Sequence, residues 1–203
     1  MKREEKTELT KQKIIAAAIE EFGANGYSGA YLNRICSRGI PKGLLYHNFE
    51  NKDAIYLASM KRCYDDLLQA LKDAQIGDSL QEYMSVRLRF FEEYPFKSNI
   101  IFESMFQPPE ALYTEIDMVR KEFNEFNKTF FERILDEVPL RKNVSRQDTV
   151  TYFEVMQSMF NIYFGSTFFR ELSMSERAIK HEEYLPTLLD FMLYGVAERS
   201  NTL

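Results

Sequence analysis

Residues 31–49 read YLNRICSRGIPKGLLYHNF, and this stretch predicts two short helices joined by a tight turn. The first helix is expected at about residues 30–37 and the second at about residues 41–48. Gly39 lies in the break, and Pro41 suits the first turn of the second helix, where its missing N–H costs nothing. A helix, a short break with a glycine and a second helix are the parts of a helix-turn-helix.

The second of these helices carries side chains that suit contact with DNA. A reading helix must present its N-terminal half to the major groove while its neighbour lies across the backbone. Lys42 and Lys52 can neutralise phosphate. Tyr46 and His47 can donate hydrogen bonds to phosphate oxygens. The alternative is that the lysines are ordinary surface charges, that His47 is only solvated and that Tyr46 is core, as Phe49 is expected to be.

The segment IPKGLLYHNFENKDAI, residues 40–55, resembles the recognition-helix signature of the TetR family of bacterial regulators. The family pattern is Gly-hydrophobe-Ser-Lys-Gly-x-Leu-Tyr-x-x-Phe-x-x-Lys. It is matched in register by Gly39, Ile40, Lys42, Gly43, Leu45, Tyr46, Phe49 and Lys52. Upstream, IIAAAIEEFGANGY resembles the family's first helix through Phe22, Gly26 and Tyr27. The resemblance covers about residues 10–60, and beyond them only length and helical character agree.

The resemblance implies roles for individual residues. It implies that Lys42 and Tyr46 touch the DNA backbone, that Gly43 permits close approach and that Lys52 contacts phosphate. It also implies that the helix beginning at Lys52 links the head to a sensor domain and moves when ligand binds. The predicted DNA-contact set is Lys42, Gly43, Leu44, Tyr46, His47, Asn48 and Lys52.

Two departures from the family pattern affect the turn. Pro41 stands where the family usually has Ser. The segment Ile35–Ile40 is one residue shorter than usual, so that an alanine usually packed inside the turn is either missing or replaced by Arg38. Because burying an arginine is costly, the first helix of the motif is expected to end early or to rotate.

Helical spacing of apolar residues dominates the chain, and no alternating stretch predicts a strand. We expect an all-α fold of about nine helices, at about residues 10–24, 30–37, 41–48, 51–74, 79–94, 97–106, 110–136, 145–171 and 182–199. Expected N-caps are Asn51, Asp78 or Ser79, and Ser145, the last in an imperfect capping box with Asp148. Pro186 is expected to kink the last helix or reset its start. The expected division is a helix-turn-helix DNA-binding domain at 1–52 and a ligand-binding and dimerisation domain at 53–203.

Charge and composition fit this division. Residues 1–62 hold eleven Lys and Arg and seven Asp and Glu, a net charge of +4, whereas the whole chain of 203 residues carries −5, which leaves −9 for the remainder. A basic head on an acidic body is typical of a DNA-binding module joined to a sensor. With 45% hydrophobic residues, no apolar run of membrane-spanning length and no secretory signal, the chain is expected to be cytoplasmic. Cys36 and Cys63 are expected to stay reduced rather than form a disulfide.

Aromatic and Met side chains crowd the helices after residue 63, and most of them must be core. The resemblance implies a pocket for an apolar or aromatic effector among the fifth to eighth helices. The predicted ligand-contact set is Arg87, Phe91, Phe102, Met105, Phe123, Asn127, Gln157, Phe160 and Asn161. Asn161, inside the apolar stretch MFNIYF, has two possible explanations, ligand contact or an internal hydrogen bond.

The last two helices are expected to form a homodimer interface. The eighth helix is apolar around nearly its whole circumference, and Gly165-Ser166 permits close helix approach. In the ninth, a stripe is formed by Leu185, Leu188, Leu189, Met192 and Val196. The alternative is a helix buried within one protomer. A two-fold dimer would place two heads on half-sites of a palindromic operator, about 34–36 Å apart.

These patterns lead to the hypothesis of a repressor that a small molecule releases from double-stranded DNA. An enzyme is the first rival, but GxSxG, HExxH, CxxC, P-loop and dinucleotide motifs are absent from the sequence. Accordingly no catalytic residue, cofactor or metal is predicted. The second rival is a sensor or interaction protein that has lost DNA binding, which the shortened turn makes conceivable.

Overall fold

The computed structural model describes residues 3–196, and within that range the chain forms helices and no strand, which confirms the expected all-α fold. The helices are α1 (Arg3–Gly29), α2 (Leu32–Ser37), α3 (Lys42–Asn48), α4 (Lys52–Asp73), α5 (Leu80–Glu93), α6 (Pro95–Phe106), α7 (Tyr113–Asp136), α8 (Arg146–Gly165) and α9 (Met174–Val196). Short 3-10 turns lie before α7, at Glu110–Leu112, and after α8, at Thr167–Phe169. We call α1–α3 the head and α4–α9 the body.

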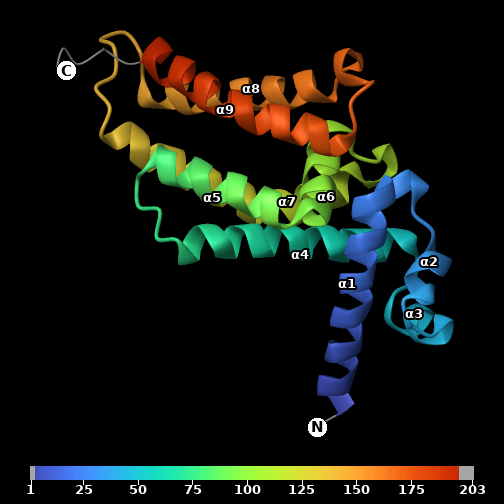
Figure 1. The fold of residues 1–203 in the computed structure, drawn as a ribbon. Coiled ribbons are helices and arrows are strands. Elements are labelled where there is room, and N and C mark those ends of the chain that lie inside the picture. Colours follow the sequence, from blue (N-terminus) through green and yellow to red (C-terminus); the bar gives the residue numbers. More distant parts are fainter. Residues whose placement is uncertain (1–2, 197–203) are drawn as a thin grey trace.

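The helices of the body stack in layers (Figure 1). In that view α8 and α9 lie at the top, α5, α6 and α7 in the middle, and α4 below them. α1 crosses one end of α4 and runs away from the body, with α2 and α3 packed against it. One apolar core continues from the head into the body, and a smaller one lies between α7, α8 and α9. Within residues 3–196 no helix combines the length and apolar character that a membrane span requires.

The first helix is longer than expected at its N-terminus. It begins at Arg3 rather than near Thr10, although its buried stripe begins only at Ile14. In the extra turns, residues 5–9 are all exposed and, apart from Leu9, are Glu, Lys and Thr, which are supported by local helix propensity and by a hydrogen bond from Thr10 Oγ1 to the Lys6 carbonyl at 2.8 Å. An expectation based on apolar periodicity therefore missed them. At the other end the chain bends at Gly26, whose positive φ of 68° suits a residue without a side chain.

The turn between α2 and α3 keeps Arg38 out of the core. α2 ends at Ser37, at the predicted boundary, so the early end expected from the shortened turn is wrong; the Arg38 backbone N–H caps the helix by donating to the Ile35 carbonyl. The Arg38 side chain is exposed and pairs with Glu20 of α1. Gly39 then turns the chain with a φ of 85°, and Ile40 enters the core in place of the arginine. The shortened turn thus costs no buried charge.

Three predicted helix starts are confirmed by their caps. The side chains of Asn51, Ser79 and Ser145 each accept a hydrogen bond from the backbone N–H three residues on. These bonds satisfy donors that the first turn of a helix leaves unpaired. α4, α5 and α8 therefore start within a residue of their expected positions.

The boundary between α8 and α9 was predicted wrongly. α8 ends at Gly165 rather than near Glu171, because Ser166 is extended and a short 3-10 turn follows. α9 begins at Met174 rather than near Glu182. Its start is a capping box, in which Ser173 Oγ accepts from the Glu176 N–H while Glu176 accepts from the Ser173 N–H. Pro186 does not reset the helix but lies inside it.

Candidate nucleic-acid interface and internal cavity

Helix α3 is held to the head by a single fully buried side chain. Of its seven residues only Leu45 is buried, and it packs in the same core as Ile35 of α2 and Ile14 of α1. Ile40, just before α3, is also buried. A short helix anchored on one side chain leaves the rest of its surface to solvent or to a partner.

The predicted DNA-contact residues lie together on the outer side of α3. The exposed ones are Lys42, Gly43, Leu44, Tyr46 and His47. A Cβ added at Gly43 would meet nothing within 4 Å, so another molecule can approach the backbone there. Asn48 is half-buried, and its Nδ2 donates to the Leu44 carbonyl at 2.7 Å. Phe49 is half-buried rather than fully buried, and it packs against the core as expected.

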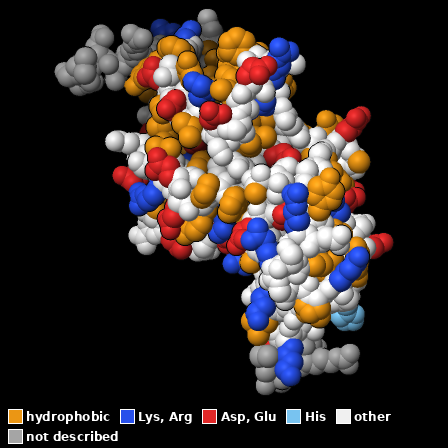
Figure 2. Space-filling view, turned by 45° about the vertical axis from the view of Figure 1, so that its right-hand side comes forward, with side chains coloured by type: hydrophobic (Ala, Val, Ile, Leu, Met, Phe, Trp, Pro, Cys, Tyr) orange, Lys and Arg blue, Asp and Glu red, His pale blue; other side chains and the backbone are white. Residues whose placement is uncertain are grey.

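Lys52, the last of the predicted contacts, is held beside the head at the start of α4. Its Nζ lies 4.8 Å from the centroid of the Tyr27 ring, a cation–π contact. The Tyr27 hydroxyl donates to Asp53 Oδ1 at 2.6 Å, and this bond raises the pKa of Tyr27 to about 12. Figure 2 shows several Lys and Arg side chains and few acidic ones on the visible face of this lower end of the molecule.

Glu103 joins the head to the body, and the sequence reasoning missed it. Its carboxylate on α6 accepts hydrogen bonds from the Tyr27 N–H at 2.8 Å and from the Tyr56 hydroxyl at 3.0 Å. Burial raises the pKa of Glu103, while the same hydrogen bonds oppose the shift. A single acidic residue inside the apolar stretch IIFESMF was the sequence signal for a buried, partnered carboxylate.

A second contact at this seam is a close approach of α1 to α6. A Cβ added at Gly23 would lie 2.5 Å from Phe96 Cβ and 2.6 Å from the Phe96 carbonyl oxygen. The Gly23 carbonyl accepts a hydrogen bond from Asn99 Nδ2 at 2.8 Å. Backbone contact of this kind fixes the direction in which α1 leaves the body.

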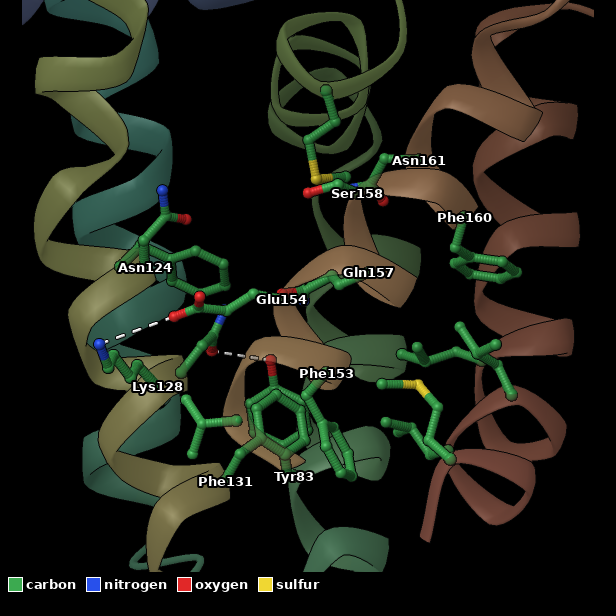
Figure 3. Close-up of a pocket in the computed structure, with 18 of the residues that line it drawn as sticks. Tyr83, Asn124, Lys128, Phe131, Phe153, Glu154, Gln157, Ser158, Phe160 and Asn161 are labelled. Atoms are coloured by element: carbon green, nitrogen blue, oxygen red, sulfur yellow. Dashed lines mark hydrogen bonds and ion pairs between the residues drawn. The ribbon is translucent and has the colours of Figure 1, made fainter. Parts of the chain in front are cut away.

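The body encloses a cavity of about 340 Å³, lined by residues of α4 to α9. Seven of the predicted ligand-contact residues line it: Arg87, Met105, Phe123, Asn127, Gln157, Phe160 and Asn161. Phe91 and Phe102 do not, because their rings pack on each other at 4.8 Å within the main core. Figure 3 shows Phe131, Phe153 and Phe160 around this space, with Asn124 and Lys128 of α7 facing Glu154 and Gln157 of α8.

A buried polar network forms one wall of the cavity. Arg87 of α5 pairs with Glu182 of α9 at 2.6 Å, and both side chains are almost inaccessible to solvent. Arg87 also donates to the Tyr83 hydroxyl, which in turn donates to Asn127 Oδ1 at 2.8 Å. Burial alone would raise the pKa of Glu182, but Arg87 and His181 outweigh it and lower this pKa to about 2. Two charges therefore neutralise each other inside the body.

His181 extends this network to α8. Its Nδ1 lies 3.1 Å from Glu182 Oε1, and its Nε2 lies 3.1 Å from Asn161 Oδ1. Burial lowers the pKa of His181, whereas Glu182 raises it. Of the two explanations for Asn161, the structure shows the internal hydrogen bond. The sequence reasoning missed His181, Glu182 and Tyr83, because each also has a partner far along the chain, namely Asn161, Arg87 and Asn127.

A different part of α8 and α9 presents apolar side chains to solvent. On α8 the exposed residues Val155, Met159 and Ile162 follow helical spacing, and Ile162 is 71% exposed. On α9 Tyr184 and Phe191 are exposed. The predicted α9 stripe is different: Leu185, Leu189 and Met192 are buried within the protomer, Leu188 is half-buried, and the side chain of Val196 lies outside the described residues. Burial within one protomer, the alternative noted above, therefore describes that stripe.

Both cysteines are unpaired, as expected, with Cys36 half-buried and Cys63 buried. Within the described part of the chain, no group of three His, Cys, Asp or Glu residues is arranged to hold a metal ion.

The fold and the exposed reading helix define a helix-turn-helix protein of the DNA-binding class. The profile of the family "Bacterial regulatory proteins, tetR family" matches residues 14–59. The negative transcriptional regulator IcaR of the biofilm operon icaADBC, from Staphylococcus epidermidis, is 30% identical over 130 residues, which span 62% of this chain and 67% of IcaR. The transcriptional regulator RutR of Escherichia coli is 28% identical over 120 residues, 57% of each chain.

Solved structures share the fold over nearly the whole chain. A TetR-family regulator from Cytophaga hutchinsonii superposes with a TM-score of 0.65 at 16% identity, over 96% of this chain and 98% of that one. A TetR-family regulator from Pectobacterium atrosepticum gives 0.64 at 14% identity, over 99% and 100%. The chain belongs to the TetR family of bacterial transcriptional regulators.

Proposed function

We propose that this protein is a cytoplasmic, dimeric repressor that a small molecule releases from its operator. The observation that carries the proposal is a reading helix with an open outer face, connected through Glu103 of α6 to a body that contains a cavity. Residues 1–52 would bind DNA, and residues 53–203 would bind the effector and form the dimer. The relatives support the assignment as a repressor, since IcaR is named a negative transcriptional regulator.

Three groups on the head are proposed to contact DNA phosphates. Lys42 supplies charge at the start of α3 and Lys52 at the start of α4, and the exposed Tyr46 hydroxyl supplies a hydrogen bond. Gly43 leaves room for the backbone to approach the duplex. Leu44, His47 and Asn48 are proposed to lie at the same surface.

Effector response is proposed to travel through α6. Met105 of α6 lines the cavity, and Glu103, two residues earlier, holds the Tyr27 N–H and the Tyr56 hydroxyl. A ligand that binds one position of α6 better than another would shift the equilibrium between two orientations of the head. A dimer would then lose the spacing of its two heads that matches the operator, and its affinity for DNA would fall.

A second copy of this chain is proposed to cover the apolar face of α8 and α9. Val155, Met159, Ile162 and Phe191 leave more apolar surface exposed on these two helices than isolated surface residues would. Ile162→Glu is expected to yield monomers in light scattering, because a two-fold axis buries the charge twice. Met118→Glu, on the exposed side of α7, is the matched control and should leave the dimer intact.

The test of DNA binding is a titration of the protein with the DNA upstream of its own gene, followed by fluorescence anisotropy at several salt concentrations. Lys42→Ala is expected to weaken binding and to reduce the slope of log affinity against log salt by about 1. Lys121→Gln, an exposed lysine of α7, should leave both unchanged. If the wild-type protein shows no specific binding at low salt, the chain is a sensor without DNA-binding function and the proposal fails.

A further inference from the structure

Arg120 is a half-buried cation whose Nε–H has no hydrogen-bond partner among the described residues. It lies on α7 and lines the cavity, and its Nε is inaccessible to solvent with no hydrogen bond to any described group. Glu125 and Glu132 also line the cavity, yet neither forms an ion pair with Arg120. An arginine donor left unpaired in the interior is rare, because water would otherwise solvate it, and it calls for a missing partner.

The other cations of the cavity are already neutralised. Arg87 pairs with Glu182 at 2.6 Å, and Lys128 pairs with Glu154 at 3.6 Å across the gap between α7 and α8. Figure 3 shows this second pair beside the cavity. Among the described lining residues Arg120 is therefore the Arg or Lys that forms no ion pair, and its Nε–H is also unpaired.

The walls near Arg120 are aromatic and apolar. Tyr64 of α4, Met105 of α6 and Phe123 of α7 line the cavity with it, and the rings of Tyr64 and Phe123 lie 5.4 Å apart. Arg120 lies one helical turn before Phe123 on α7, so its side chain is on the face of α7 that meets Tyr64. Burial raises the pKa of Tyr64, and the charge of Arg120 opposes this shift. The Tyr64 hydroxyl is itself engaged with Ser104 of α6 at 2.7 Å.

We propose that the cavity binds a compact organic acid, an aromatic or short alkyl carboxylate whose anionic group pairs with Arg120. A planar guanidinium binds a carboxylate through two parallel hydrogen bonds, and the aromatic walls take the apolar body of the ligand. A volume of about 340 Å³ is at the small end of the range for ligand pockets, so the acid has to be compact. This inference rests on the proposed function, because it names the effector class of the same cavity.

The position of Arg120 also connects this ligand to the head. A carboxylate on Arg120 would sit against Tyr64 of α4 and the Tyr64–Ser104 hydrogen bond, one residue from Glu103. α4 begins at Lys52, one of the proposed phosphate contacts. Binding at this end of the cavity therefore acts on the two helices that carry the head.

The first test uses the protein without ligand. Arg120→Met removes the buried, unpaired Nε–H while keeping an apolar side chain of similar length, so it is expected to raise the melting temperature by about 2–4 °C. Lys121→Met, on the next residue and exposed to solvent, is the control and should change it by less than about 1 °C. An arginine with a purely structural role would instead lower the melting temperature when removed, and that result would overturn the inference.

The second test measures binding of matched probes by calorimetry: 3-phenylpropionate and octanoate against 3-phenylpropionamide and octanamide. The acids are expected to bind at least about tenfold more tightly than the amides, and Arg120→Gln should abolish this preference while Lys121→Gln keeps it. Equal binding of acid and amide, a preference that survives Arg120→Gln, or no binding of any probe overturns the inference. If the amides bind and release DNA, the proposed function still stands, because DNA release is measured separately by anisotropy.

Discussion

Polar side chains are exposed on the reading helix α3 but buried and paired beside the cavity of the body. α3 leaves Lys42, Tyr46 and His47 exposed and buries only Leu45. The network beside the cavity buries Arg87 and Glu182 and pairs them with each other. The head thus keeps its polar groups available for an outside partner, whereas the body satisfies most of its own. A polar group in the head is expected to matter for binding, and one in the body for stability.

The largest effect is expected from breaking the buried ion pair of the body. Arg87→Met leaves Glu182 buried without its main counter-charge, so the free energy of unfolding should fall by about 3–5 kcal/mol in urea denaturation. The double variant Arg87→Met with Glu182→Leu should recover most of the loss. Lys61→Met, which breaks the exposed pair of Lys61 and Asp65 in α4, is the control and should cost less than about 1 kcal/mol. A loss below 1 kcal/mol for Arg87→Met would mean that the body does not depend on this pair.

Alanine substitutions at two glycines are expected to distinguish effects on protein stability from effects on DNA binding. At Gly23 an added methyl would collide with Phe96 of α6, so Gly23→Ala is expected to cost about 1–3 kcal/mol. At Gly43 the methyl meets open space, so Gly43→Ala should stabilise the helix by about 0.5–1 kcal/mol.

DNA affinity, measured by anisotropy, should nevertheless fall for Gly43→Ala, since the methyl would stand between α3 and the duplex. A Gly43→Ala variant that binds DNA as tightly as the wild type would show that the duplex does not approach α3 at this point.

Two matched helix caps give a smaller effect. Asn51 caps α4 beside the head and Ser79 caps α5 inside the body, each by accepting one backbone N–H. Replacing either with Ala should cost about 1 kcal/mol in thermal unfolding. Only Asn51→Ala is expected to weaken DNA binding, because it frays the turn that holds Lys52. Equal DNA affinities for the two variants would contradict the proposed role of Lys52.

The smallest effect expected is a pH dependence of the body. Burial lowers the pKa of His181, so as pH falls the unfolded chain takes up a proton before the folded one does. The contribution of His181 to stability is complete above the unfolded pKa of about 6.5 and is lost as pH falls toward the lower folded value. Glu182 favours the charged histidine and Arg87 opposes it.

Unfolding free energies between pH 7.5 and pH 5.5 test this sign. The wild type should lose stability on acidification, and His181→Gln should lose less. His47→Gln, on the exposed side of α3, is the matched control and should follow the wild type. Because the raised pKa of Glu103 acts in every variant, the difference between wild type and His181→Gln isolates the histidine. If the free energy of unfolding falls more steeply with acidification in His181→Gln than in the wild type, the pKa of His181 is not lowered in the folded protein.

Sequence reasoning succeeded where the relevant partners are close in the chain. The caps at Asn51, Ser79 and Ser145 and the two helices of the reading motif were predictable, because each depends on residues within one helical turn. The start of α9 had an equally local signal in Ser173 and Glu176, which periodicity alone overlooked. The exposed turns of α1 gave no apolar signal, so their helix was missed.

The cavity wall was harder to predict, because its contacts join distant segments. Arg87 was identified as a polar residue in the body, but its partner Glu182 is 95 residues away and was not considered. Phe91 and Phe102 could not be distinguished from cavity residues such as Phe123, because one sequence pattern serves both core and lining. The unpaired state of Arg120 is a property of the packed structure and has no sequence signal.

The Glu103 junction has a consequence for exchanging heads among relatives. A chimaera that joins residues 1–60 to the body of another regulator would leave the Tyr27 N–H and the Gly23 carbonyl without Glu103 and Asn99. Such a graft needs an acidic residue and an amide residue at the equivalent positions of the recipient's α6. It also needs a glycine in the donated α1 where that helix meets the backbone of α6. A head therefore transfers its operator specificity to another regulator only if the contacts between the head and α6 are transferred with it.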